Sequence, residues 1–435
     1  MTYYLPRNLY NRMNSVLRSF NGLRPCFLNM QSCGGCSVRQ QNLVFPSLLL
    51  TPKNLCASST LASPRVDSTS HNSVVMASES IQAVQVCRDS VDCAEKEVKA
   101  GSSNGRVMLI DGTSIIYRAY YKLLAKLNHG HLSNADGNGD WVLTIFTALS
   151  LIINVLELVP SHVAVVFDHD GIPFGHTSYP TKESFMAKGS NFRHIMYASY
   201  KSNRPPTPDT VVQGLQYLKA SIKAMSIAVI EVPGVEADDV IGTLAMRSID
   251  EGHRVRVVSP DKDFFQILSP SLRLLRAASR GGGMVSFGME DFAKRFGILK
   301  PSQFVDVAAL VGDRCDNIPG VHGIGNVHAV ELITKFGSLE NLLQCVDQVE
   351  EERIRQALIN EADKAVLSKN LALLRTDLPF YMVPFNTKNL MFRKPEDNGE
   401  KFASLLDAIS AYAEGSSPTG IIRRASYLWK KLETR

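Results

Sequence analysis

Nine carboxylates that share one kind of placement are the residues of this chain best suited to chemistry. Three of them end apolar runs that are typical of buried strands: VMLID at Asp111, VAVVFD at Asp168 and VRVVSPD at Asp261. The full set is Asp111, Asp168, Glu236, Asp238, Asp239, Asp261, Asp263, Asp313 and Asp316. In an open parallel sheet the carboxyl ends of the strands form the ligand crevice, so these side chains are expected to converge. Because converging carboxylates repel one another, the pattern indicates an enzyme with divalent cations between them.

Local structure explains part of this set without a metal. Glu236, Asp238 and Asp239 open a predicted helix, where the helix dipole stabilises acids, but three acids in four positions exceed what capping requires. Asp316 is also compatible with a turn formed by bonding of its side chain to the backbone. Together the nine suit a two-metal hydrolase, in which two ions activate water and clamp the attacking and leaving oxygens of a phosphodiester. Oxygen ligands favour Mg²⁺ or Mn²⁺ over zinc.

A long loop supplies the complementary charge. The segment FRHIMYASYKSNRPP, residues 192–206, interleaves cations with aromatic rings; these are Arg193, His194, Lys201 and Arg204, with Tyr197 and Tyr200. Cations hold phosphates and aromatic rings stack on unpaired bases, which is the combination expected for single-stranded nucleic acid. Lys201 is further placed to stabilise charge at the scissile phosphate. A solvated surface loop of the same composition remains an alternative.

Two tight turns in PGVHGIG, Pro319–Gly325, precede the predicted helix NVHAVELITKF. Glycine-rich turns at a helix N-terminus present backbone N–H groups to a phosphate, aided by the helix dipole. A helix–helix turn with glycine at its caps would give the same pattern. The segment therefore predicts a phosphate contact only in combination with the other motifs.

Strand-like and helix-like segments alternate from Arg106 onward, which predicts an α/β domain with a mostly parallel sheet. Strands are expected at 107–111, 162–168, 227–231 and 254–258, with a hairpin near 272–287. Helices are expected at 114–127, 141–158, 209–226 and 236–250. The irregular stretch 169–208 is long enough to predict a functional loop. From 289 to 375 the signals are helical, and 420–435 is expected to form a basic surface helix.

The first 66 residues differ in composition from the rest of the 435-residue chain. They hold six Arg, one Lys and no acid. The remainder of the chain contains 40 of the 47 basic residues and all 42 acidic residues, so its net charge is −2. Leu9, Met13, Val16, Leu17 and Phe20 share one face of a predicted helix. An Arg-containing, acid-free amphipathic leader is typical of a transit peptide for the mitochondrion or the plastid. No apolar run reaches the roughly 18 residues that a membrane span needs.

The motifs together resemble a known family. IDGTSIIYRAY, VVFD, SYKSNRPPTP, VPGVEADDVIGTLA, SPDKDFFQIL, LVGDRCDNIPGVHGIG and RTDLP occur in this order over about residues 105–380. They resemble the 5′ nuclease (flap endonuclease-like) family, most closely the 5′–3′ exonuclease domain of bacterial DNA polymerase I, here as a stand-alone organelle-targeted protein. The resemblance implies a PIN-like sheet flanked by helices, a helical arch, and a C-terminal helical subdomain with a helix–three-turn–helix clamp. It also implies metal-dependent 5′–3′ exonuclease and flap endonuclease action on DNA and RNA primers.

The resemblance assigns roles by motif. All nine carboxylates match the family's ligands for two Mg²⁺ ions, for which Mn²⁺ can substitute, and Lys201 and Arg204 match the catalytic cations of the arch. The matching DNA-binding residues are Arg118, Arg193, Tyr200, Lys262, Gly320, Gly323 and Gly325. The clamp that contains the three glycines implies a bound K⁺.

The expected organisation has five parts: a transit peptide at 1–66, a disordered linker at 67–104, a catalytic domain with the arch at 105–288, a helical DNA-binding subdomain at 289–380 and a C-terminal extension at 381–435. The expected partners are DNA with 5′ ends or flaps, RNA–DNA primers and a separate organellar DNA polymerase and ligase. The protein is expected to be a monomer with no membrane contact. The sequence departs from the family's pattern in a longer stretch after Asp168, and in His322 and the run Asn326–His328, where Lys and Thr are common. The alternatives are a branched-DNA binding protein without catalysis and a PIN-type ribonuclease.

Overall fold

The computed structural model describes residues 105–128, 140–169, 191–278, 283–413 and 415–434. The predicted transit peptide, the predicted linker and most of the segments 128–140 and 169–191 lie outside the described residues. Among the described residues, no helix is both long enough and apolar enough to cross a bilayer.

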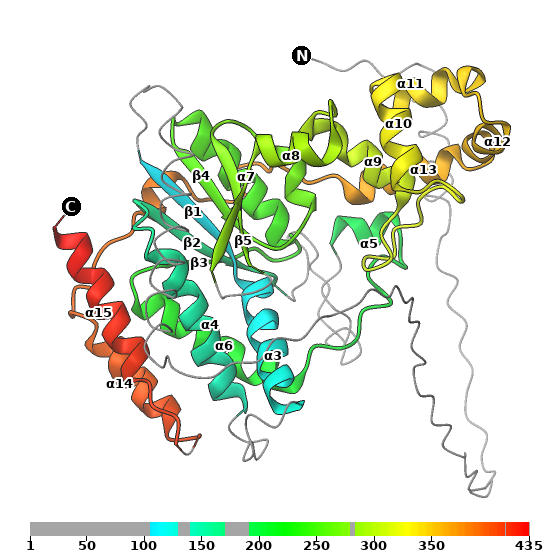
Figure 1. Ribbon diagram of the computed structural model, residues 1–435. Coiled ribbons are helices and arrows are strands. Elements are labelled where there is room, and N and C mark those ends of the chain that lie inside the picture. The colour runs from blue at the N-terminus through cyan, green and yellow to red at the C-terminus, as the bar shows by residue number, and fades with distance from the viewer. Residues whose placement is uncertain (1–104, 129–139, 170–190, 279–282, 414, 435) are drawn as a thin grey trace, which may run out of the picture. The chain divides into compact units, whose positions relative to one another are not determined.

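A six-stranded sheet with the order β3-β2-β1-β4-β5-β6 forms the centre of the catalytic region (Figure 1). Its strands are β1 (Arg106–Asp111), β2 (His162–Phe167), β3 (Ala228–Glu231), β4 (Arg254–Val258), β5 (Leu272–Ala277) and β6 (Met284–Phe287). Strands β1 to β5 pair in parallel, and β6 pairs antiparallel with β5 as the predicted hairpin. The predicted mostly parallel α/β sheet is therefore confirmed.

Alternation along β1 divides the core into two layers, because successive strand side chains point to opposite faces. Val107 and Leu109 pack in the layer that contains α7 (Ala237–Asp250). Met108 and Ile110 pack in the opposite layer, with α3 (Gly112–Asn128), α4 (Asp140–Leu156) and α6 (Asp209–Ala224). Since both faces of β1 are covered, its near-continuous apolar run is what a central parallel strand requires.

Helices follow the hairpin, as predicted. They are α8 (Met289–Phe296), α9 (Phe304–Val311), α10 (Asn326–Phe336), α11 (Leu339–Gln344), α12 (Glu352–Asn360) and α13 (Ala362–Ala372). A short helix inside the predicted functional loop, α5 (Phe192–Met196), contacts α13. The end of α13 and the base of the loop are therefore joined, although they are far apart in the sequence.

The C-terminal extension packs back on the sheet region. The short 3₁₀ segment Thr387–Leu390 contacts β2 and α7, and Met391 forms a bridge with His162. Helix α14 (Glu400–Ser410) packs on α6, and α15 (Thr419–Glu433) packs on α4. In Figure 1 the two helices lie on the side of α4 and α6 that faces away from the sheet.

Candidate active site

Three of the predicted carboxylates lie at the carboxyl edge of adjacent strands. Asp111 is the last residue of β1, Asp168 follows β2, and Asp261 follows β4. The pairing order places β1 between β2 and β4, so the register brings the three loops to one edge. The convergence expected from the sequence is therefore present, and it results from the strand order of the sheet.

Hydrogen bonds hold this edge in place. Ser114 donates its backbone N–H to Asp111 at 2.8 Å, and the Ser259 hydroxyl donates to the other Asp111 oxygen at 2.8 Å. Asp168 accepts the backbone N–H of Ala237 at 2.8 Å and thereby fixes the start of α7 beside β2. Ser114 and Ser259 were not among the predicted site residues. Their signal is local, since one serine follows Asp111 by three residues and the other precedes Asp261 by two.

The carboxylates of this edge repel one another. Burial raises the pKa of Asp111 to about 6, and the nearby Asp168 adds to the effect. Burial raises the pKa of Asp238 well above its usual value, and the charges of Asp111, Asp261 and Asp168 raise it further. Burial, and then the charge of Asp261, raises the pKa of Asp263 to about 8. Each raised pKa means that the ionised carboxylate is destabilised where it stands.

These side chains fit divalent cations in chemistry. Within the described part of the chain, no three or more His, Cys, Asp or Glu side chains lie close enough together to hold a metal ion without rearrangement. The donors are nevertheless all oxygens, and the charges that raise the pKa of Asp238 come from three other aspartates. A cation between them would remove this repulsion and would suit the hard oxygen donors that Mg²⁺ prefers.

Arg193 and Asp239, predicted from the sequence as a DNA contact and a metal ligand, form a buried ion pair. The Arg193 guanidinium donates to both oxygens of Asp239, at 2.6 and 2.9 Å, and to the carbonyls of Leu371 and Leu373, at 2.9 and 2.8 Å. Arg193 is 3% exposed and Asp239 is 1% exposed. The Arg193 side chain is thus placed inside the protein. Asp239 also accepts the Arg375 N–H, at 2.9 Å.

Two other cations of the loop, Lys201 and Arg204, bind carboxylates directly. The Lys201 ammonium lies 3.0 Å from Glu236 and 3.8 Å from Asp316, and Arg204 also pairs with Asp316. Burial alone would raise the pKa of Glu236, but Lys201 and Arg193 outweigh it and lower that pKa to about 2. Lys201 has a φ of +54°, a left-handed conformation that a non-glycine residue rarely adopts. Such strain is frequent at functional sites.

Tyr200, which was predicted from the sequence to contact a base, is buried. Its ring is 3% exposed, and its hydroxyl lies 3.3 Å from Glu236 and 3.4 Å from Asp316. The Tyr200 hydroxyl therefore contacts two carboxylates, and the buried ring is not exposed for stacking. Asn191, which the sequence interpretation missed, caps α5 and donates to Glu236 at 2.5 Å. No local pattern marks Asn191, because its partner is 45 residues away.

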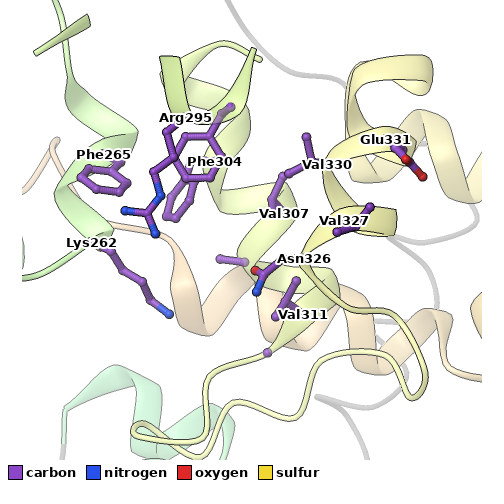
Figure 2. A pocket seen from close by; sticks show the side chains of 13 residues that line it. Lys262, Phe265, Arg295, Phe304, Val307, Val311, Asn326, Val327, Val330 and Glu331 are labelled. Atoms are coloured by element: carbon purple, nitrogen blue, oxygen red, sulfur yellow. The ribbon is translucent and has the colours of Figure 1, made fainter. Parts of the chain in front are cut away.

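The second group of carboxylates lies around Lys262. Its ammonium is 2.9 Å from Asp313, and the Asp263 N–H donates to Asp261 at 2.9 Å. A pocket of about 620 Å³ opens beside this group, between Lys262 and Asn326 at the start of α10 (Figure 2). Rings and aliphatic side chains form its floor, and Lys262 and Arg295 supply positive charge.

The predicted clamp glycines differ in backbone conformation and in exposure. Gly320 has a φ of +66°, and a Cβ there would lie 2.6 Å from the Gly312 nitrogen, so glycine is needed on both grounds. Gly323 has a φ of +81° and is exposed, and Gly325 is the exposed N-cap of α10. The His322 N–H in this turn donates to Glu361 at 2.6 Å. Arg118, the remaining predicted DNA contact, is exposed on α3.

Two family models cover the catalytic and helical regions. The model described as 5′-3′ exonuclease, N-terminal resolvase-like domain, matches residues 106–297, and the one described as 5′-3′ exonuclease, C-terminal SAM fold, matches residues 299–398. The chain belongs to the 5′-3′ exonuclease family. Its nine carboxylates and its clamp glycines all lie within these two ranges.

Curated relatives of this exonuclease include DNA polymerases of bacteria. The chain is 35% identical over 294 residues to the thermostable DNA polymerase I of Thermus filiformis, covering 68% of the chain and 31% of the relative. It is 31% identical over 299 residues to DNA polymerase I of Streptococcus pneumoniae, covering 68% and 31%. The exonuclease thus spans about a third of the length of these relatives.

Two solved structures match most of the chain at low sequence identity. The T5 5′-exonuclease with bound zinc has a TM-score of 0.48 at 20% identity, covering 71% of this chain and 100% of that one. The catalytic core of Rad2 in complex with a DNA substrate has a TM-score of 0.46 at 15% identity, covering 76% and 92%.

Proposed function

We propose that this exonuclease hydrolyses phosphodiester bonds at the 5′ ends and 5′ flaps of DNA, and of RNA primers, with two Mg²⁺ ions. The observation that carries the proposal is the raised pKa of Asp111, Asp238 and Asp263 at the carboxyl ends of the strands, which burial causes and which the charges of neighbouring aspartates increase. A protein gains nothing in stability from such an arrangement unless a ligand of opposite charge occupies it. In a member of the 5′-3′ exonuclease family, that ligand is a divalent cation.

The residues that would hold the two ions are the carboxylates other than Asp239; they are Asp111, Asp168, Glu236, Asp238, Asp261, Asp263, Asp313 and Asp316. When bound, Mg²⁺ supplies a nucleophile at neutral pH and neutralises charge on the phosphate. Asp239 contributes indirectly, because its ion pair with Arg193 fixes the first turn of α7. That turn also carries Asp238.

In this proposal Lys201 and Arg204 exchange their carboxylate partners for the phosphate of the substrate. Both cations now neutralise Glu236 and Asp316. Once these carboxylates face divalent cations, Lys201 and Arg204 are free to hold the scissile phosphate and to stabilise its developing negative charge. The left-handed backbone of Lys201, and its N–H bond to the Asp316 carbonyl at 2.9 Å, keep its side chain directed at this site.

The remaining parts of the proposal concern the duplex and the cell. The exposed turn at Gly323 and Gly325 holds one strand of the duplex through its backbone N–H groups, and K⁺ supports that turn. The acid-free leader directs the exonuclease to the mitochondrion or the chloroplast. There a separate polymerase and ligase complete the repair, and the exonuclease acts as a monomer.

Digestion of end-labelled flap, nicked and RNA-primed duplexes tests the activity. We expect 5′-end products with Mg²⁺ and none with EDTA, and we expect Asp168→Ala and Asp261→Ala to abolish cleavage while flap binding persists. Binding without cleavage by the unaltered protein would support the branched-DNA binding alternative, and cleavage of RNA alone the ribonuclease. Import of a fluorescent fusion of residues 1–66 into isolated mitochondria or chloroplasts tests the location.

A further inference from the structure

The outer face of α15 carries an exposed stripe of cations with one aromatic ring. Arg423, Tyr427 and Lys430 occur at i, i+4 and i+7, a spacing that places them on one side of a helix. All three are exposed, and Tyr427 is 59% exposed. The Lys431 ammonium lies 4.8 Å from the centre of the Tyr427 ring. Arg423 thus precedes the ring by four residues, and Lys430 and Lys431 follow it by three and four.

The opposite face of α15 is already occupied. Ile421, Ala425, Leu428 and Trp429 are buried, and the Trp429 ring packs edge-on against Phe402 of α14 at 5.8 Å. Arg424 binds Glu157 of α4 at 2.8 Å. Because the apolar face is covered by α4 and α14, this basic helix has no apolar face left to insert into a membrane. Only the cationic stripe remains for a partner.

The stripe also lacks neutralising partners. Within the part of the chain that the structure describes, the ion pairs of α15 join Arg424 to Glu157 and Glu433 to Lys394. Neither includes Arg423, Lys430 or Lys431. Unneutralised surface cations around an exposed ring attract a polyanion that also has flat apolar groups, which is the chemistry of a nucleic-acid single strand.

We propose that this stripe is a second nucleic-acid binding surface, which holds a single strand with its phosphates at Arg423 and Lys430 and a base on Tyr427. The two cations are seven residues apart, so the helix separates them by roughly 10 Å along its axis. One strand can therefore contact both, with the ring between them. The surface lies beyond residue 398, where the second family model ends, and on a helix layer away from the strand ends that carry the carboxylates.

The salt dependence of single-strand binding tests this surface directly. Full-chain protein in EDTA is titrated into a fluorescent oligo(dT), and anisotropy gives the affinity at several salt concentrations. Each phosphate contact on a single strand contributes about 0.7 to the slope of log affinity against log salt. We expect Arg423→Gln/Lys430→Gln to reduce that slope by about 1.4. The matched control Lys223→Gln/Lys388→Gln, which removes two exposed charges from α6 and the 3₁₀ segment, should leave it unchanged.

Substitutions at the ring separate stacking from charge. Tyr427→Leu should weaken oligo(dT) binding about fivefold to tenfold, within the range of one lost base stack, whereas Tyr427→Phe should retain it. An equal slope for Arg423→Gln/Lys430→Gln and its control would overturn the proposal. The proposal would also fail if Arg423→Gln/Lys430→Gln bound an acidic peptide more weakly but bound oligo(dT) as the unaltered protein does. The inference rests on the proposed function for its class of ligand, but the experiments distinguish failure of the binding surface from failure of the nuclease activity. Binding is measured without metal, and cleavage is measured on a nicked duplex without single strands.

Discussion

The guanidinium of Arg193 and the carboxylate of Asp239 form two parallel hydrogen bonds, 2.6 and 2.9 Å long, inside the protein. The same guanidinium binds two carbonyls at the end of α13. One side chain therefore joins the base of the basic loop, the first turn of α7 and the helical region. The basic loop is thus anchored next to the carboxylates.

Removal of this pair should destabilise the fold. Arg193→Leu leaves Asp239 ionised, buried and without its cation, so we expect the free energy of unfolding to fall by about 3–5 kcal/mol. Urea denaturation followed by circular dichroism measures it. Lys262→Leu, which breaks the more exposed pair with Asp313, is the control and should cost about 1 kcal/mol or less. A fully stable Arg193→Leu protein with weak DNA binding would restore Arg193 as a DNA contact.

Neutralisation of one repelling carboxylate should stabilise the metal-free protein. In EDTA, Asp238→Asn removes a charge that Asp111, Asp261 and Asp168 oppose, so we expect its Tm to rise by about 2–4 °C, the shift that accompanies ~1 kcal/mol. Added Mg²⁺ should raise the Tm of the unaltered protein, and raise that of Asp238→Asn by less. Thermal scans with and without Mg²⁺ measure both, and Asp250→Asn on the exposed end of α7 is the control. A lower Tm for Asp238→Asn in EDTA would contradict the repulsion.

The stability of the metal-free protein should fall as the pH rises. The pKa of Asp111 is about 6 and that of Asp263 about 8 in the folded state, against roughly 3.9 in an unfolded chain. Between these values the folded state binds more protons than the unfolded state, so stability is lost from about pH 4 up to pH 8. Tm measured in EDTA from pH 5 to pH 8 should decrease, and Asp263→Asn should flatten the decrease. A difference between the two proteins that does not change with pH would refute the assignment.

Lys201 should act on the reaction more than on binding. Its ammonium lies 3.0 Å from Glu236 and 3.8 Å from Asp316, two of the carboxylates proposed to bind the ions, so its charge is placed to act on the reacting phosphate. We expect Lys201→Ala to slow single-turnover cleavage of a flap about 100-fold to 1,000-fold, and to weaken flap binding less than tenfold. Rapid-quench kinetics and anisotropy measure the two effects. Equal losses in both would reduce Lys201 to a phosphate contact.

The positions of the strands and the carboxylate edge could be predicted from the sequence because their signals are local. Apolar runs of strand length end at Asp111, Asp168 and just before Asp261, and parallel strands must end at one edge of the sheet. The basic face of α15 was also visible, because helical spacing separates Arg423 and Lys430 from Leu428 and Trp429. Local periodicity thus determined which elements form and which of their faces are polar.

Tertiary structure alone decided which polar groups of those motifs are exposed. Arg193 and Lys201 lie in one basic loop, yet one is buried with Asp239, 46 residues away, and the other faces the carboxylates. Tyr200 became a buried support and not a stacking ring, because Glu236 and Asp316 surround its hydroxyl. Burial of a polar group depends on partners that are distant in sequence, and no local spacing encodes them. The sequence therefore determined the chemistry of the site, and the packing of the chain decided which residues are free to perform it.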